Sequence, residues 1–260
     1  MTGASRGIGA AIARALAREG LELLLVGRDE VRLSEVSAEI AAAGGKASTL
    51  VQDLSAPEAA ETVARAGVER LGVPYLLVNN AGIATAQRFD RRPRDEWERE
   101  LTTDLLAPLR LTYAFLPLLL QRRRGQVIFI GSASADRPLP RLAVYSGAKA
   151  AVRGFGRALD LEVARRGVRV SVVEPVYVRT ELGRRPSDSE APLERLAREH
   201  PRAVLEPDVV ARAVVRLLYH PRPLVRVPLA WAASRLLLEA LDPLFDTRRQ
   251  LPPPAGDGRG

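Results

Sequence analysis

Thr2-Gly3-Ala4-Ser5-Arg6-Gly7-Ile8-Gly9 is the stretch that decides the fold class of this 260-residue chain. A helical pattern follows it at residues 10–18, and an apolar run follows at residues 21–26. Glycines allow a tight turn and a close approach of backbone N–H groups to a phosphate, and the next helix presents free N–H groups. The stretch therefore predicts a phosphate-binding turn, although a glycine-rich turn alone is a weak signal.

Apolar runs and helical patterns alternate along the rest of the chain. The expected strands are 21–26, 47–51, 75–78, 127–130, 168–173 and 224–227. The expected helices are 10–18, 30–42, 57–71, 94–121, 143–165 and 207–219. Because the strands show little polar alternation, we expect a parallel sheet with both faces covered. The pattern indicates a doubly wound, Rossmann-type α/β fold with three layers, α-β-α.

The composition excludes several classes of site. The chain has no cysteine, so disulfides, thiolate catalysis and thiolate metal sites are ruled out. Each of the two histidines, His200 and His220, precedes a proline, and we expect no metal site. The sequence has no run of about 18 apolar residues and no secretory pattern. With 47% hydrophobic residues, the chain suits one large domain, and we expect a cytoplasmic location.

The formal charge of +8 raises the hypothesis of a nucleic-acid or anionic-membrane partner. Of the 39 basic residues only two are lysines, Lys46 and Lys149, and the arginines are spread among acidic residues. This distribution is typical of a solvated surface, and we expect no nucleic-acid partner. Since arginine is used almost everywhere else, the lysine at position 149 is informative.

Arg28 follows the first apolar run and stands 19 residues past Gly9. An acidic residue near this point would bind the ribose 2′-hydroxyl of NAD, whereas an arginine suits the 2′-phosphate of NADP. Arg6 in the glycine loop would add a second positive charge. The plainer alternative is a pair of surface arginines. We favour NADP(H) as the cofactor because position 27 is glycine and not an acid.

Ser132, Tyr145 and Lys149 form a second candidate site. Tyr145 and Lys149 are four residues apart and share one face of a helix, and Ser132 lies just beyond an expected strand. An ammonium near a tyrosine favours the phenolate and lowers the pKa of the phenol from about 10. The serine hydroxyl can hold a substrate oxygen. Taken singly, a Tyr/Lys pair on a helix is usually exposed on the surface and has no functional role.

Four motifs together resemble the short-chain dehydrogenase/reductase family. They are the loop 2–9, Asn79-Asn80-Ala81-Gly82, Ser132, and Tyr145-Ser-Gly-Ala-Lys149, in the family's order and with 13 residues from Ser132 to Tyr145. The resemblance covers residues 2–228. It implies an oxidoreductase that transfers a hydride between NADP(H) and a small carbonyl or alcohol substrate.

The resemblance also implies which residues bind the cofactor. In chain order they are Gly3, Ser5, Arg6, Gly7, Ile8, Gly9, Arg28, Asp53, Asn79, Ala81, Tyr145, Lys149, Pro175 and Thr180. The three glycines would line the pyrophosphate, and Asp53 would lie near the adenine. Asn79 and Ala81 would support the central sheet and the cofactor, and Thr180 would hold the nicotinamide carboxamide.

The implied catalytic residues are Ser132, Tyr145, Lys149 and a fourth position that departs from the family. Tyr145 would protonate the carbonyl oxygen in reduction or take the hydroxyl proton in oxidation, while Lys149 would also bond the nicotinamide ribose. The family's fourth residue is an asparagine, but Asp104 stands at that position here. An ionised Asp104 would pair with Lys149 and oppose the lowering of the tyrosine pKa, so we expect shifted or weaker activity.

Two further departures concern the start of the chain and Val176. Family members carry an apolar strand before the glycine loop, at the centre of the sheet, but here only Met1 precedes Thr2. We expect this first strand to be missing from the sequence and the natural protein to begin upstream. Val176 replaces the family's glycine after Pro175, and the larger side chain would narrow the cofactor cleft.

The expected organisation is a dinucleotide-binding catalytic domain at 1–228 with a substrate-covering loop at 183–206. A C-terminal amphipathic helix is expected at 229–245, followed by a disordered tail at 246–260. The helix would pack against the domain or a second subunit. Its alternative role, peripheral contact with a membrane, is disfavoured because Arg235 is its only basic residue.

Alternatives remain for activity and assembly. A subclass alternative is reduction of a 3-oxoacyl thioester, and the apolar C-terminal segment weakly suggests an apolar substrate. A weakly active or inactive NADP(H)-binding regulatory protein is the alternative from a different class. The resemblance implies a homodimer or homotetramer formed by the helices 94–121 and 143–165. Candidates for that face, or for the core, are Phe115, Leu118, Phe155 and Leu159.

Overall fold

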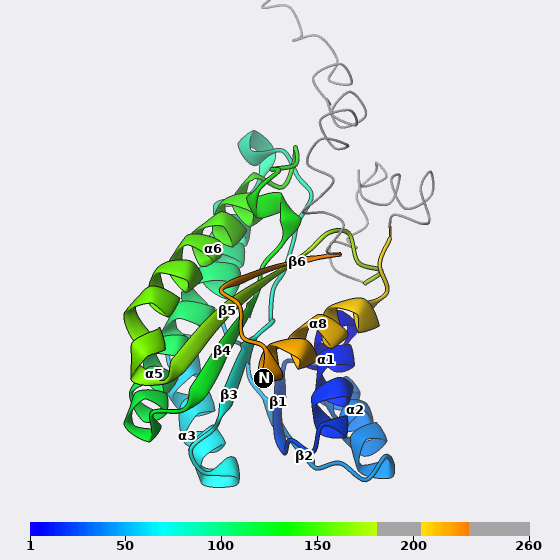
Figure 1. Cartoon of the computed structure of the whole chain (residues 1–260). Coiled ribbons are helices and arrows are strands. Elements are labelled where there is room, and N and C mark those ends of the chain that lie inside the picture. The colour runs from blue at the N-terminus through cyan, green and yellow to red at the C-terminus, as the bar shows by residue number, and fades with distance from the viewer. Residues whose placement is uncertain (181–203, 229–260) are drawn as a thin grey trace, which may run out of the picture.

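The computed structural model describes residues 1–180 and 204–228 (Figure 1). Its strands are β1 Leu23–Gly27, β2 Ala47–Val51, β3 Leu76–Asn79, β4 Gly125–Ile130, β5 Val168–Pro175 and β6 Leu224–Val227. Its α-helices are α1 Gly7–Arg18, α2 Glu30–Ala42, α3 Ala59–Leu71, α4 Arg94–Leu101, α5 Ala107–Arg122, α6 Ala143–Val163 and α8 Pro207–Tyr219. The expected helix 229–245, the tail 246–260 and all of the loop 183–206 except its last three residues lie outside the described part.

Every strand pair in the described residues is parallel, which confirms the doubly wound α/β fold. β1 pairs with β2, and a four-stranded sheet runs in the order β3-β4-β5-β6. Met1 and Thr2 lie between the two sheets. The Val26 N–H donates to the Met1 carbonyl at 2.9 Å, and the Thr2 N–H donates to the Val78 carbonyl at 3.0 Å. These two residues occupy the place where the family resemblance puts a central strand.

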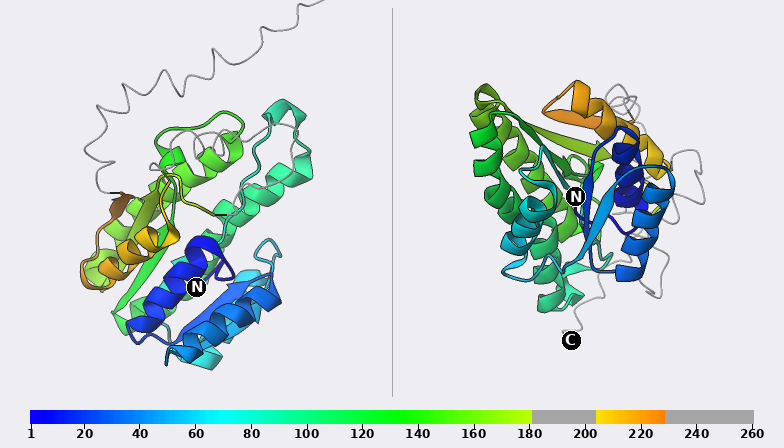
Figure 2. Two further views of the ribbon diagram at one scale, coloured as in Figure 1. Left: turned by 90° about the vertical axis from the view of Figure 1, so that its right-hand side faces the viewer. Right: turned by 90° about the horizontal axis from the view of Figure 1, so that it is seen from below.

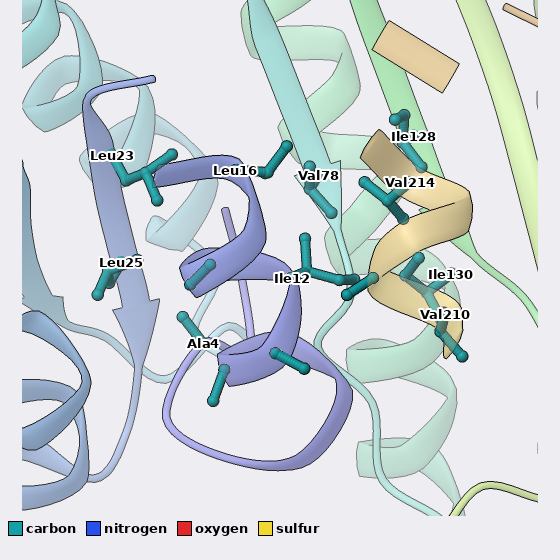
Figure 3. Packing of buried hydrophobic residues seen from close by; sticks show 14 of the residues in the cluster. Ala4, Ile12, Leu16, Leu23, Leu25, Val78, Ile128, Ile130, Val210 and Val214 are labelled. Atoms are coloured by element: carbon teal, nitrogen blue, oxygen red, sulfur yellow. The ribbon is translucent and has the colours of Figure 1, made fainter. Parts of the chain in front are cut away.

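Helices cover both faces of the strands, as the apolar strands require. In the right-hand view of Figure 2, α1, α2 and α8 lie on one side of the strands, and α3, α5 and α6 lie on the other. On the first side, Ile12 and Leu16 of α1 are fully buried and point toward β3 and α8 (Figure 3). Burying each such side chain contributes roughly 1.5–3 kcal/mol. The α1 helix is therefore held firmly, and so is the glycine loop before it.

On the second side, the four apolar candidates for a subunit face belong to the core. Phe115 and Leu159 are buried, and Leu118 and Phe155 pack against the same cluster as partly buried residues. Gly156 lets α6 approach the sheet, because a Cβ there would lie 2.7 Å from the Val172 Cγ2. This close contact sets the position of α6, which carries Tyr145 and Lys149, over β4 and β5.

The expected helix over 94–121 is present as a continuous helical run, but its middle is a π-helical turn, Thr102–Leu106, that joins α4 to α5. Pro108 has no N–H, so the regular helical hydrogen bond to the carbonyl four residues earlier cannot form. The Thr102 and Thr103 hydroxyls donate to carbonyls of α4, at 2.8 and 2.9 Å. The widened turn leaves Asp104 buried, at 1% exposure. Such π-turns are frequent at functional sites.

The helical run Arg94–Arg122 is long and apolar enough to cross a membrane by length and composition alone. Within its most apolar window, 44% of the residues are buried in the protein. Leu111, Phe115 and Leu119 account for part of that burial, against the sheet. Core helices have the same profile, so the run is weak support for a membrane span.

Candidate active site

The glycine loop has the backbone that a phosphate-binding turn requires. Gly3 and Gly7 adopt φ angles of +64° and +53°, a region that favours glycine. Gly9 is excluded from carrying a side chain for a different reason: a Cβ there would overlap the carbonyl oxygen of Gly3. The α1 helix begins at Gly7, so the first amides of α1 lie in this loop.

Asn80 fastens this loop to the end of β3. The Asn80 Nδ2 donates to the Thr2 carbonyl at 3.1 Å and to the Gly3 carbonyl at 3.0 Å. The Thr2 hydroxyl in turn accepts the backbone N–H groups of Asn80 and Ala81, each at 3.1 Å. Sequence reasoning selected Asn79 and Ala81 and missed both Asn80 and Thr2. The signal was present, since Asn80 lies inside the same four-residue motif.

Asn79 faces away from the glycine loop, toward α5. Its Nδ2 donates to the Thr112 hydroxyl at 3.2 Å, and the side chain is buried. Thr112 also donates to the Pro108 carbonyl at 2.7 Å. Asn79 thus links β3 to the first turn of α5, and any effect it has on the loop passes through the neighbouring backbone.

Thr180 lies beside the glycine loop, although it follows β5, a strand that is distant in sequence. A Cβ on Gly7 would lie 3.1 Å from the Thr180 methyl group, so the two residues are neighbours across 173 positions of sequence. Pro175 is the last residue of β5, and the Val176 N–H donates to the Val227 carbonyl at 3.0 Å. The segment from Pro175 to Thr180 therefore runs from the carboxyl end of β5 to the start of α1.

Arg28 and Asp53 lie beyond the carboxyl ends of β1 and β2. Arg28 is exposed, and its charge acts on Asp53. The Asp53 carboxylate accepts the Ser55 N–H at 3.0 Å, the Ser55 hydroxyl at 2.8 Å and an Arg99 N–H at 3.1 Å. Partial burial alone would raise the pKa of Asp53, but the bonds from Ser55 and the charges of Arg28 and Arg99 lower it overall. Asp53 is therefore a fixed anion at this edge.

Ser132, Tyr145 and Lys149 come together as the spacing indicates. Ser132 follows β4 and begins a short 3₁₀ turn, Ala133–Ala135, with its hydroxyl accepting the Ser134 N–H at 3.1 Å. The Ser132 hydroxyl also lowers the pKa of the Tyr145 phenol, which places the two groups close together. The Lys149 Nζ lies 5.4 Å from the centre of the Tyr145 ring and donates to the Ile130 carbonyl at 3.3 Å. Tyr145 and Lys149 are 8% and 5% exposed, so this is not surface decoration.

Asp104 joins this cluster from the π-turn. One of its oxygens accepts the Ile83 N–H at 2.7 Å, and the other lies 3.3 Å from the Lys149 Nζ. Gly82 makes room for the pair, because a Cβ there would lie 3.1 Å from Asp104 and 3.4 Å from Lys149. The expectation that Asp104 pairs with Lys149 therefore agrees with the geometry.

The charges around the cluster shift its proton equilibria. Burial raises the pKa of Asp104 to about 6, although Lys149 lowers it. Burial lowers the pKa of Lys149, but Asp104 and Tyr145 raise it by more. The pKa of Tyr145 is raised, first by burial and then by Asp104, against the lowering effect of Lys149. The sequence-based expectation of a lowered tyrosine pKa thus does not describe this state, because burial outweighs the effect of the Lys149 ammonium and Asp104 adds to the rise.

A second buried ion pair lies one turn before Asp104. Arg92 and Glu100 meet at 2.6 Å with side-chain exposures of 3% and 0%, and Glu100 also accepts the Thr85 N–H at 3.0 Å. The negative charge of Glu100 adds to the raising of the Asp104 pKa. The sequence contains no motif that marks this pair.

The residues at this edge fit a dinucleotide. Two glycines with positive φ and one glycine with no room for a side chain form a cradle at the start of α1. Arg28 supplies positive charge at one end, and the Ser132, Tyr145 and Lys149 side chains supply hydrogen-bonding groups at the other. The carboxyl edge of an open parallel sheet is where such folds bind their ligands.

Fold and site together define an α/β oxidoreductase of the dinucleotide-linked class. The chain belongs to the short-chain dehydrogenase family, whose model matches residues 1–191.

Curated relatives agree with this assignment. The chain is 31% identical over 182 residues to an uncharacterized oxidoreductase of Staphylococcus epidermidis, covering 70% of this chain and 78% of that protein. It is 34% identical over 221 residues to the glycine betaine reductase ATRR of Emericella nidulans, covering 85% of this chain and 17% of that protein. It is 37% identical over 183 residues to the probable oxidoreductase EphD of Mycobacterium tuberculosis, covering 70% of this chain and 31% of that protein. The chain thus spans only a minor part of the latter two.

Solved structures agree as well. An alcohol dehydrogenase from the archaeon Thermococcus sibiricus, complexed with 5-hydroxy-NADP, superposes with a TM-score of 0.75 at 30% identity, covering 87% of this chain and 93% of that one. A putative NAD(P)-dependent gluconate 5-dehydrogenase from Beutenbergia cavernae, with bound NADP, has a TM-score of 0.77 at 31% identity, covering 90% of this chain and 95% of that one.

Proposed function

We propose that the chain is an NADP(H)-dependent oxidoreductase that interconverts a carbonyl and an alcohol. The observation that carries the proposal is the meeting of Ser132, Tyr145 and Lys149 at the sheet edge that also holds the glycine loop. The nicotinamide supplies or accepts the hydride when it is bound. The chain's own residues supply the position of the substrate oxygen and its proton.

Each of the three side chains has a distinct task. Tyr145 gives its phenol proton to a carbonyl oxygen in reduction and takes the hydroxyl proton in oxidation. Ser132 hydrogen-bonds the same oxygen and holds it against the phenol. Lys149 stabilises the phenolate by its charge and would present its remaining N–H to the nicotinamide ribose. The pyrophosphate would bind on the loop 2–9, with Asp53 near the adenine at one end of the cofactor and Thr180 near the nicotinamide carboxamide at the other.

The preference for NADP(H) rests on charge. Arg28 is exposed beyond β1, Arg6 is exposed in the glycine loop, and no acid occupies position 27. Two solved structures of the same fold and about the same identity carry NADP-type ligands. A 2′-phosphate near Arg28 would have a cationic partner that NADH does not need.

Reversing the charge of Arg28 tests that preference. For Arg28→Glu we expect NADPH to bind about 10- to 100-fold more weakly, with NADH affected much less, because only NADPH carries the 2′-phosphate. Fluorescence titration of both cofactors measures the change. Arg18→Glu, at the exposed end of α1, alters the net charge equally and should leave both affinities as they are. Equal weakening by the two variants would contradict the role of Arg28.

Asp104 gives this site a pH dependence of its own. Its carboxylate raises the pKa of Tyr145, so Asp104→Asn should lower the pKa of the phenol and raise the rate of alcohol oxidation several-fold near pH 7. The pH profile of kcat for oxidation measures this, with its rising limb moved to lower pH. An unchanged profile would show that Asp104 does not control the proton on Tyr145.

The same substitution changes stability against pH. In the folded chain the pKa of Asp104 is about 6, above its unfolded value, so the folded state binds more protons between about pH 4 and pH 6. This carboxyl therefore makes the free energy of unfolding fall as the pH rises through that window. Asp104→Asn removes that part of the fall, whereas Asp95→Asn, at an exposed position of α4, does not.

The decisive experiment for the function is turnover of NADPH and NADH, followed by absorbance, across a panel of ketones, aldehydes and 3-oxoacyl thioesters. Turnover with NADPH that is faster than with NADH supports the proposal. Tight NADPH binding without turnover on any panel member would favour the alternative, a regulatory protein. The raised pKa of Tyr145 favours that alternative, because it leaves less of the phenolate that alcohol oxidation needs.

We infer assembly into a dimer or tetramer from the outer faces of α5 and α6. Tyr113 and Leu161 are each 84% exposed there, although both have large apolar surfaces. The family resemblance implies pairing through these two helices. Sedimentation of the full chain and of a Leu161→Glu variant tests the assignment, and a monomer in both would refute it.

A further inference from the structure

An ion network around the buried Glu174 ties the Ser132 turn to the helix that carries Tyr145. Arg153 lies on α6, one turn beyond Lys149. Its Nε donates to the Glu174 carboxylate at 2.5 Å, and its Nη1 donates to the Asp136 carboxylate at 3.1 Å. Neither the cofactor cradle nor the proton-transfer residues include these three side chains.

Glu174 packs against Gly131, the residue that precedes Ser132. It lies on β5 directly before Pro175 and is 1% exposed. A Cβ on Gly131 would lie 3.2 Å from the Glu174 Cγ, so the Glu174 side chain packs against the Gly131 backbone. Any shift of Glu174 would therefore be felt one residue away from Ser132.

Asp136 closes the other end of the same turn. The Asp136 N–H donates to the Ala133 carbonyl at 3.0 Å, and the turn begins with the Ser132 hydroxyl as its cap. Residues 132–136 thus form one hydrogen-bonded unit. The Asp136 carboxylate receives Arg153 on one oxygen and Arg226 of β6, at 3.3 Å, on the other.

Burying the Glu174 carboxylate is costly, which argues that the network does more than fill space. Two carboxylates face two guanidinium groups, and burial raises the pKa of Glu174 although Arg153 and Arg226 lower it. A buried ion pair often contributes little to stability compared with apolar residues of the same shape. What it does provide is fixed geometry, because a guanidinium can hold two carboxylates at set angles.

We propose that Arg153 is a positioning residue that fixes the Ser132 hydroxyl relative to the Tyr145 hydroxyl, through Asp136 and Glu174. The inference rests on the proposed function, in which both hydroxyls bind one substrate oxygen. Arg153 and Tyr145 share one helix. The bond from Arg153 to Asp136 holds one end of the turn, and its bond to Glu174, which packs against Gly131, holds the other, so together they set the distance between the two hydroxyls. A misplacement of about 1 Å can cost about a hundredfold in rate.

Asp136→Ala is the principal test, because Asp136 is 42% exposed and its loss leaves no buried charge alone. We expect kcat to fall about tenfold, with the NADPH dissociation constant and the thermal midpoint nearly unchanged. Asp136→Asn keeps one acceptor and should recover part of the rate. Arg153→Met should lose more rate and also stability, since Glu174 then lacks its nearest partner. Arg157→Met, an exposed arginine one turn further along α6, is the matched control and should behave as wild type.

Crystal structures of wild type and Asp136→Ala give a readout that needs no turnover. The inference predicts a displacement of the Ser132 hydroxyl from Tyr145 by more than about 0.5 Å. An undisplaced turn, or a kcat that falls only in step with cofactor affinity and thermal midpoint, would overturn the inference. Absence of turnover in wild type would refute the proposed function instead, and the structures would still decide the inference.

Discussion

Tyr145→Phe should lower kcat for carbonyl reduction by about a thousandfold. The substitution removes one oxygen and keeps the ring, which is buried beside Lys149. Without the phenol, the site has no group that can give a proton to the substrate oxygen, since Ser132 and Lys149 are placed to bond and to stabilise. The loss should appear in kcat, because the hydroxyl acts on the reacting oxygen.

Three measurements separate this result from a damaged protein. The NADPH affinity and the thermal midpoint of Tyr145→Phe should stay close to wild type. Tyr113→Phe makes the same chemical change on α5, where the side chain is 84% exposed, and should keep full activity. If Tyr145→Phe also turned over at the wild-type rate, the proton-transfer mechanism would be wrong.

Gly9→Ala is the second change with a large expected effect. A Cβ at this position would overlap the Gly3 carbonyl and lie 2.6 Å from the Asn80 Nδ2. The two groups are the acceptor and the donor of the hydrogen bond that ties the glycine loop to the end of β3, so neither can move without breaking that bond. We expect NADPH affinity to fall at least about a hundredfold and the free energy of unfolding to fall by about 1–3 kcal/mol.

Gly154→Ala is the control for Gly9→Ala. It makes the same substitution inside α6, where a Cβ would meet nothing within 4 Å. Alanine is the better helix former there, so the free energy of unfolding should rise by up to about 1 kcal/mol with NADPH binding unchanged. Isothermal titration and chemical denaturation measure both quantities. Wild-type NADPH affinity in Gly9→Ala would contradict the assignment of this loop to the cofactor.

Asp104 makes this site differ from the arrangement that the family resemblance implies. The Lys149 ammonium is shared between the Tyr145 phenol and a carboxylate at 3.3 Å, and the raised pKa of Asp104, about 6, lies close to neutral pH. A change of protonation at Asp104 therefore alters how strongly Lys149 acts on Tyr145. The effect on rate has opposite signs in the two directions, because oxidation needs the phenolate and reduction needs the phenol.

The sequence alone predicted the layers, the parallel sheet and the meeting of Ser132, Tyr145 and Lys149. Apolar strands of low polar alternation separated by helices allow few arrangements other than a covered parallel sheet, and the structure has that sheet. Local spacing was also sufficient to predict that Tyr145 and Lys149 lie side by side, because residues four apart on a helix share a face in any fold. The pairing of Asp104 with Lys149 followed from charge and family position.

Only the tertiary structure decided the features that depend on contacts between distant segments. Asn80 reaches the Gly3 carbonyl across 77 residues, and the Arg153 side chain meets Glu174 across 21. No local pattern encodes such partners, because the chain must first bring separate strands and helices to one edge. The π-turn at Asp104 is intermediate: Pro108 was a visible local cause, but the direction of the carboxylate depends on the packing of α4 and the π-turn against α6. The pKa of Tyr145 belongs to the same group, since burial sets its direction and burial is a property of the whole fold.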